Sequence, residues 1–317
     1  MLSWPDFVEK QIVYIKSKEV KNLAVRNNNL VVKEDNKLLN QISLAKLFAV
    51  FVVGEATFTS VLIKKILDNG IVLLFMNRNL KPYCTIGGET EGNVLLRKKQ
   101  YQDFLILQKS KALIINKIEN QTVLLKRLRT KNKKIKGTIE NLVKLAKNIE
   151  KAKDKKSVLG FEGRAARIFF EAYFGKFNWH GRKPRTKFDE KNTLLDIGYT
   201  FLFNFIEANL RLYGFDLYCG FLHTEFYQRK SLVCDLMEPF RCIVEHALHR
   251  MLALKKFDEY DFKVRKGGYY LKFEANDKYA KEFLESIMER KEDIFKYMQS
   301  FYRGTIKEEN DFPKFNI

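Results

Sequence analysis

The chain has 317 residues and a formal charge of +20, and 46% of its residues are apolar and 14% aromatic. This composition provides enough apolar side chains for folded cores, so it excludes a disordered basic tail as well as collagen-like and proline-rich proteins. An excess of Lys and Arg on a protein with an ordinary core favours a polyanionic partner, although the charge alone says nothing about chemistry.

The first 86 residues predict a β-rich domain. Strands are expected at residues 11–15, 23–26, 30–33, 47–53, 71–76 and 81–86. The continuous apolar run 47–53 is typical of a strand buried on both faces. Three asparagines at 27–29 predict a tight turn, and residues 59–67 predict a short helix that ends at Asn69 and Gly70.

The rest of the chain predicts a larger helical domain, residues 98–317, after a glycine-containing linker at 87–97. Helices are expected at 98–127, 161–174, 193–212, 231–255 and 278–302, with residues 269–273 as one strand of a small hairpin. Because Pro239 has no backbone N–H, the helix 231–255 is expected to kink or restart there. The predicted fold class is therefore an α+β multidomain protein, with a small N-terminal β-rich domain and a mostly α-helical C-terminal domain.

The densest basic tract is KRLRTKNKKIK at residues 126–136, which holds seven basic and no acidic residues. A second basic group lies in the loop 175–192. Charge runs are commonly solvated faces, and this interpretation stays open beside the alternative, a surface that contacts phosphates.

Three acidic residues and one histidine are candidates for chemistry. Glu162 falls on the apolar stripe of helix 161–174, where a carboxylate is costly unless a cation meets it. His223 lies in an apolar stretch, and Asp235 and Glu238 stand at i and i+3 in the helix that follows. All four residues could also have purely structural roles: the acids in ion pairs or at the positive end of a helix dipole, and the histidine as a hydrogen-bonded core residue. Together, carboxylate oxygens and an imidazole also suit Mg²⁺ or Mn²⁺, which beside a phosphate could polarise a P–O bond.

These residues lie in motifs of a known family. GFEGRAAR at 160–167, GFLH at 220–223 and SLVCDLMEPFR at 231–241 occur in family order and at family-like separations. On these motifs the chain resembles the CRISPR-associated protein one (Cas-one) family over essentially its whole length. Leu217, where many members carry Pro, and RIFF at 167–170, where a Tyr-Phe pair is more usual, look like packing changes.

The resemblance implies a metal-dependent DNA endonuclease and integrase of CRISPR spacer acquisition, which joins the 3′ ends of captured foreign DNA into the repeat array. It implies catalytic residues Glu162, His223, Asp235 and Glu238, of which Glu162, His223 and Glu238 hold Mg²⁺ or Mn²⁺. The expected partners are double-stranded and branched DNA, a second copy in a homodimer, and the smaller ferredoxin-like adaptation protein two in a heterohexamer-like complex. The candidate DNA contacts are Lys126, Arg127, Arg129, Lys131, Arg164, Arg182, Arg185 and Arg241.

Two other functions remain open beside this one. A non-catalytic basic DNA-binding scaffold of a defence complex would share the fold and charge, and a Mn²⁺-dependent nuclease assay separates the two. A membrane-surface protein is disfavoured, since the chain shows no lipidation motif and no apolar run near the ~20 residues of a membrane helix. Four cysteines without C-x-x-C spacing and an N-terminus unlike a secretory signal favour a cytoplasmic prokaryotic protein with reduced thiols.

Overall fold

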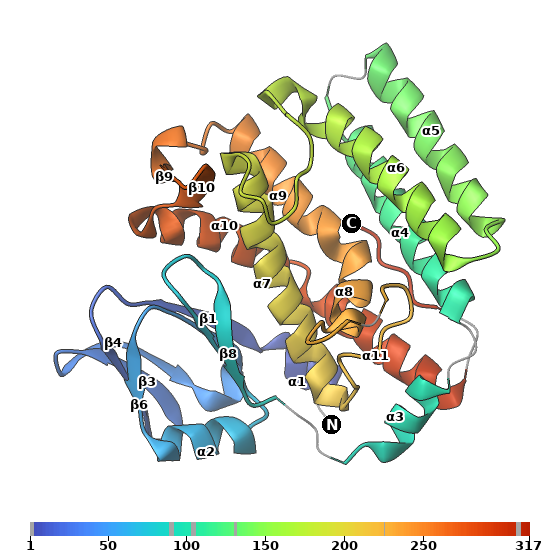
Figure 1. The fold of residues 1–317 in the computed structure, drawn as a ribbon. Helices are drawn as coiled ribbons and strands as arrows, with labels where there is room; N and C mark the ends of the chain where they lie inside the picture. The colour runs from blue at the N-terminus through green and yellow to red at the C-terminus, as the bar shows by residue number, and fades with distance from the viewer. Residues whose placement is uncertain (1–2, 89–91, 103–105, 130–131, 225, 309–311) are drawn as a thin grey trace.

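The computed structural model describes residues 3–88, 92–102, 106–129, 132–224, 226–308 and 312–317. A strand-rich part at the N-terminus is followed by a larger helical part (Figure 1). This arrangement confirms the predicted fold class.

The N-terminal part begins with helix α1 (Trp4–Val8) and contains two four-stranded sheets. Its elements are β1 (Gln11–Lys16), β2 (Lys21–Arg26), β3 (Asn29–Glu34), β4 (Lys37–Ser43), β5 (Leu47–Val53), β6 (Ala56–Phe58), α2 (Ser60–Asp68), β7 (Val72–Met76) and β8 (Pro82–Ile86). The first sheet has the order β1-β5-β7-β8, in which only β8 is antiparallel to its neighbour. The second has the order β4-β3-β2-β6, in which β2, β3 and β4 are antiparallel and β6 runs parallel to β2.

Strand β5 is buried along its whole length, as its unbroken apolar sequence predicts. On one face Phe48 and Phe51 contact Phe205 and Phe201 of the central helix α7 (Glu190–Tyr213), with ring centroids 5.5 and 6.1 Å apart. The other face belongs to a second apolar cluster between the two sheets, which includes Val50 and Val52. The first sheet is thus packed between the second sheet and the helices.

The helical part consists of helices packed around α7, together with a small hairpin. Its further elements are α3 (Val94–Tyr101), α4 (Ile106–Lys126), α5 (Lys133–Glu150), α6 (Lys155–Phe174), α8 (Ser231–Met237), the 3-10 turn η3 (Glu238–Phe240), α9 (Arg241–Ala253), β9 (Phe262–Arg265), β10 (Gly268–Leu271), α10 (Asn276–Met288) and α11 (Lys291–Lys307). Helices α4, α5 and α6 lie side by side (Figure 1). Among the described residues, none of these helices combines the length and the apolar character that crossing a bilayer requires.

Three predicted helices are interrupted in the structure. The helix expected at 98–127 is replaced by α3 and α4, and α3 begins at Val94, inside the range expected to be a linker. The helix expected at 278–302 is divided into α10 and α11 because Arg290 leaves the helical conformation, with φ −114°. The restart expected at Pro239 is present as the turn η3 between α8 and α9.

Residues 312–317 return along helix α4 and fix its position. The side chains of Asn116 and Asn120 exchange hydrogen bonds of 2.8 to 3.0 Å with the backbone of Phe315 and Ile317. Phe315 is buried against Phe240, which lies two residues after Glu238 in the same turn. This segment therefore holds α4 against the turn that carries one of the candidate ligands.

Candidate active site

Lys117 joins two of the predicted ligands. It lies on the inner side of α4, and its Nζ donates to Glu162 Oε1 of α6 at 2.5 Å and to Glu238 Oε2 of η3 at 2.7 Å. The side chains of Lys117 and Glu238 are only 7% and 4% exposed, whereas Glu162 is 23% exposed. Three elements that are distant in sequence thus meet at a single ammonium group.

A second cation supports Glu238. Arg241, one turn later in the chain, places its Nε 3.0 Å from Glu238 Oε2. Burial alone would raise the pKa of Glu238, but the positive charges of Arg241 and Lys117 outweigh it and lower the pKa to about 2. The carboxylate is therefore ionised throughout the physiological range.

His223 is held by Asp235. The fully buried Asp235 carboxylate accepts the backbone N–H groups of Phe221, Leu222 and His223 at 2.7 to 3.0 Å, and its Oδ1 lies 2.6 Å from His223 Nδ1. Because a carboxylate only accepts, Nδ1 donates to Asp235, and Nε2 is the ring nitrogen that Asp235 does not engage. The imidazole is close enough to Glu238 to lower the pKa of that carboxyl.

The residue types fit a divalent metal ion, but their present spacing is that of an ion-pair network. Two carboxylates and a histidine whose other nitrogen is held by an acid form a donor set suited to Mg²⁺ or Mn²⁺. Among the residues that the structure describes, however, no three or more His, Cys, Asp or Glu side chains are grouped closely enough to hold a metal. The ammonium of Lys117 lies where the two glutamates face each other.

Comparisons with known proteins identify the family. The profile of the family described as CRISPR associated protein Cas1 matches residues 13–285. The chain belongs to this family. It is 30% identical over 312 residues to the CRISPR-associated endonuclease Cas1 1 of Thermodesulfovibrio yellowstonii, in a match that covers 94% of this chain and 98% of the relative.

Solved structures agree on the fold. A Cas1 protein from Thermotoga maritima superposes with a TM-score of 0.82 at 18% identity, over 97% of this chain and 99% of that one. A chain of a Cas6-RT-Cas1–Cas2 complex gives a TM-score of 0.81 at 23% identity over 96% of this chain, which spans 36% of the length of that larger chain. These findings confirm the family recognised from the motifs and the expected function in CRISPR adaptation.

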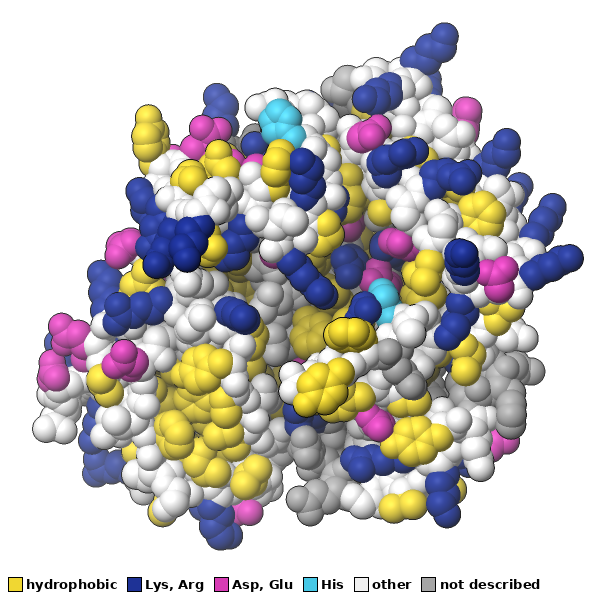
Figure 2. All heavy atoms as spheres, in the orientation of Figure 1, with side chains coloured by type: hydrophobic (Ala, Val, Ile, Leu, Met, Phe, Trp, Pro, Cys, Tyr) yellow, Lys and Arg dark blue, Asp and Glu magenta, His cyan; other side chains and the backbone are white. Residues whose placement is uncertain are grey.

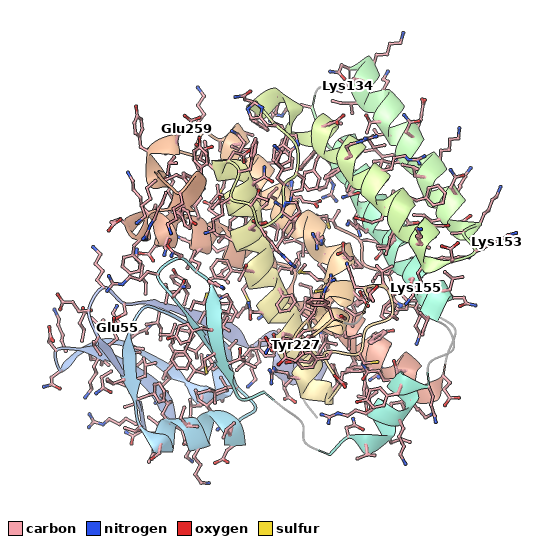
Figure 3. All side chains as sticks on the ribbon, in the orientation of Figure 1. Glu55, Lys134, Lys153, Lys155, Tyr227 and Glu259 are labelled. Atoms are coloured by element: carbon pink, nitrogen blue, oxygen red, sulfur yellow. The ribbon has the colours of Figure 1, made fainter. Side chains whose placement is uncertain are left out.

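The basic residues predicted to contact DNA lie in different surroundings. Arg164 is exposed on α6, two residues after Glu162, and Lys126 and Arg129 are exposed at the end of α4; Lys131 lies outside the described residues. Figure 2 shows Lys and Arg side chains spread over the face that carries α4 to α6. Figure 3 places Lys134 at one end of α5, and Lys153 and Lys155 near the other end.

Other predicted DNA contacts already have protein partners. Arg127 donates to the backbone oxygen of Ile317 at 2.7 Å. Arg182 forms an ion pair of 2.5 Å with Asp196, which also accepts the backbone N–H of the exposed Arg185. Arg241 pairs with Glu238, so it lies within the site.

Sequence reasoning missed Lys117, although the sequence carries a signal for it. In LIINKIENQ, residues 113–121, a lysine interrupts a helical segment in which Leu113, Ile114 and Ile118 are fully buried. A lysine on such a face needs a buried acid, and Glu162 had been recognised as an acid on an apolar stripe. In the structure, the buried lysine and the acid on the apolar stripe form an ion pair with each other.

Proposed function

We propose that this Cas1-family chain performs metal-dependent phosphodiester chemistry on DNA, with Glu162, His223 and Glu238 as ligands of Mg²⁺ or Mn²⁺. The observation that carries the proposal is that Lys117 joins Glu162 of α6 to Glu238 of η3, and that His223, held by Asp235, lies close enough to Glu238 to influence the pKa of that carboxyl. A metal ion bound there would stabilise the negative charge that grows on the phosphate oxygens during the reaction.

The protein side chains prepare the site for this task. Asp235 engages Nδ1 of His223 and fixes the ring, so that Nε2 is the nitrogen that would bind the metal. Arg241 keeps Glu238 ionised, so no proton has to leave before it binds a cation. Arg164 is exposed on α6, and we propose that it contacts a phosphate of the bound DNA.

The reaction proposed is a transesterification. The 3′-hydroxyl of a captured DNA end attacks a phosphodiester of the CRISPR repeat and the 3′-oxygen of the repeat strand leaves, so that one P–O bond forms and one breaks. The exchange needs no nucleotide cofactor, and water in place of the hydroxyl gives hydrolysis, which accounts for endonuclease activity at the same site.

The proposed partners follow from the family. A relative in fold is part of a Cas6-RT-Cas1–Cas2 complex, and we propose that this chain, as a homodimer, likewise assembles with the ferredoxin-like adaptation protein two, Cas2. The basic face over α4 to α6 supports duplex or branched DNA as the substrate.

The proposal is tested by Glu162→Gln, which keeps the size of the side chain and removes its charge. Mn²⁺-dependent joining on a branched DNA substrate should fall at least about 100-fold, because loss of a partner that only orients a metal ligand already costs about 10- to 100-fold. DNA affinity in a filter-binding assay should be nearly unchanged.

Glu171→Gln is the matched control, because Glu171 is an exposed acid on the same helix. It should retain joining. Full joining by Glu162→Gln would remove Glu162 from the ligand set, and absence of any Mn²⁺-dependent activity in the native protein would favour the non-catalytic scaffold.

A further inference from the structure

The position of Lys117 goes beyond that of an ordinary ion-pair partner. Its Nζ lies within 2.7 Å of one carboxylate oxygen of each glutamate, and both are among the proposed ligands of the metal. It therefore bridges two acids that would otherwise repel each other in a poorly hydrated site.

The charges around the two glutamates are already balanced. Among the described residues, Lys117 and Arg241 form ion pairs with Glu162 and Glu238, which amounts to two positive and two negative charges. A divalent ion added while Lys117 stayed in place would leave a local excess of positive charge. Two cations that share the same carboxylate oxygens at these distances repel each other strongly, since little water is present to screen them.

The helix that carries Lys117 is held in place on both sides of this residue. Asn116 and Asn120 bind the backbone of residues 315–317, so α4 cannot easily withdraw from the site. The lysine side chain, by contrast, has four flexible methylene groups. Movement of this side chain is the simplest way to make room for another cation.

We propose that Lys117 is a built-in counter-ion that holds Glu162 and Glu238 together in the metal-free protein and has to leave them when a divalent ion binds. Lys117 is thus a positioning residue that weakens metal binding and thereby sets the metal concentration at which the site fills. This inference rests on the proposed function, because it takes the two glutamates as metal ligands.

The test is direct titration of the purified chain with Mn²⁺, followed by electron paramagnetic resonance and without DNA. Lys117→Met removes the charge and keeps most of the volume, so it should bind Mn²⁺ at least tenfold more tightly than the native chain. Lys117→Arg keeps the charge and should bind no more tightly than the native chain. Lys111→Met is the control, because Lys111 lies on the same helix but donates to the backbone of Glu150, and its Mn²⁺ affinity should match that of the native chain.

Thermal unfolding gives a second readout. The metal-free Lys117→Met protein should melt below the native chain, and saturating Mn²⁺ should raise its melting temperature more than that of the native chain. An unchanged or weaker Mn²⁺ affinity in Lys117→Met would overturn the inference, even if Glu162→Gln confirms the ligands. If Mn²⁺ binds to none of these proteins, the proposed metal site itself is wrong and the inference falls with it.

A measurement on the native chain avoids any folding defect of the variant. Lysine acylation followed by mass spectrometry reports how accessible each ammonium group is. Saturating Mn²⁺ should increase the labelling rate of Lys117 severalfold and leave that of Lys111 unchanged. Equal or slower labelling of Lys117 with Mn²⁺ would show that it stays on the carboxylates, which contradicts the inference.

Discussion

Glu245 is a buried acid in the same helix as Arg241, and no candidate function uses it. Tyr199 Oη donates to its Oε1 at 3.0 Å, and its Oε2 has no hydrogen-bond partner among the described residues. Burial raises the pKa of Glu245 to about 7, since the nearby positive charges offset only part of the desolvation. This single carboxyl therefore makes the stability of the fold depend on pH.

The sign of this dependence follows from the two pKa values. Between the ordinary value of 4.5 and about 7, the folded chain binds more protons at Glu245 than the unfolded chain does. The contribution of Glu245 to stability is therefore present at low pH and is lost as the pH rises through this window. Glu245→Gln cannot ionise and should gain stability relative to the native chain from pH 5 to pH 8, by up to about 3 kcal/mol.

Urea unfolding of both proteins at pH 5 and pH 8 measures this difference. Two stability curves that run parallel across the range would mean that Glu245 is not the titrating group. Glu282 is an acid with a lowered pKa, because its partners Lys256 and Arg250 outweigh the desolvation. Glu282→Gln should therefore not show the same gain and serves as the control.

At the residue level, the sequence motifs located the acids and the histidine but not the cations that hold them. Glu162, His223 and Glu238 were recognisable because the family motifs are local in sequence. Lys117 carries only the signal of a lysine among buried apolar residues, and the sequence does not identify its partners, because Glu162 and Glu238 lie 45 and 121 residues away along the chain. The family motifs therefore predict candidate acids and a candidate histidine, whereas the structure was needed to find the cations that pair with Glu162 and Glu238.

The loop that carries His223 packs closely against α8, and this packing requires glycine at position 220. A Cβ atom at this position would lie 2.7 Å from Asp235 Oδ2 and 2.8 Å from Ser231 Cβ. The backbone N–H groups that bind Asp235 begin at the next residue, Phe221. A side chain at position 220 would therefore press on Asp235, the residue that holds His223.

Gly220→Ala should destabilise the chain by on the order of 2 kcal/mol through this steric overlap and should reduce strand joining. Gly137→Ala is the control within α5, where a Cβ atom would meet nothing within 4 Å. It should stabilise the chain by about 0.5–1 kcal/mol, because alanine loses less backbone entropy in a helix. Guanidinium unfolding of the two variants measures both effects, and equal stability of the two would contradict the packing argument.

The elements that sequence periodicity predicted are those with strong apolar patterns. Strand β5 and helix α7 are expected from the sequence because both are rich in apolar residues, and the structure buries most of their side chains. Strand β4 was not expected, because most of its side chains are exposed and no alternation marks it. The break between α10 and α11 was also invisible, since residues 289–290 include no Gly or Pro; Arg290 turns there to pair with Asp293.

On the scale of the whole molecule, one apolar core joins the strand-rich and helical parts. The cluster that contains Phe48 and Phe51 of β5 also contains the buried residues of α4, α6, α7 and α9. The change from strands to helices was predicted from the sequence, but this shared core was not, because periodicity identifies elements without telling which faces meet. The candidate site lies in the helical part, on α4, α6 and the turn next to α9.

The basic face over α4 to α6 is predicted to bind DNA. Lys126 and Arg129 are exposed at the end of α4, whereas Arg127 donates to the backbone of Ile317 in the C-terminal segment. The double variant Lys126→Gln/Arg129→Gln should weaken duplex DNA binding and flatten the dependence of log Kd on log salt by about 0.9 for each DNA phosphate that is no longer neutralised. Fluorescence anisotropy across a series of salt concentrations measures the slope.

Lys37→Gln/Lys46→Gln removes the same net charge from exposed positions of the strand-rich part, at the opposite side of the molecule (Figure 1). Its salt slope should stay close to that of the native chain. If both pairs changed the slope equally, DNA would respond to net charge rather than to this face. If neither pair changed it, the basic tract would be a solvated surface, and the DNA path would have to be sought elsewhere around the site.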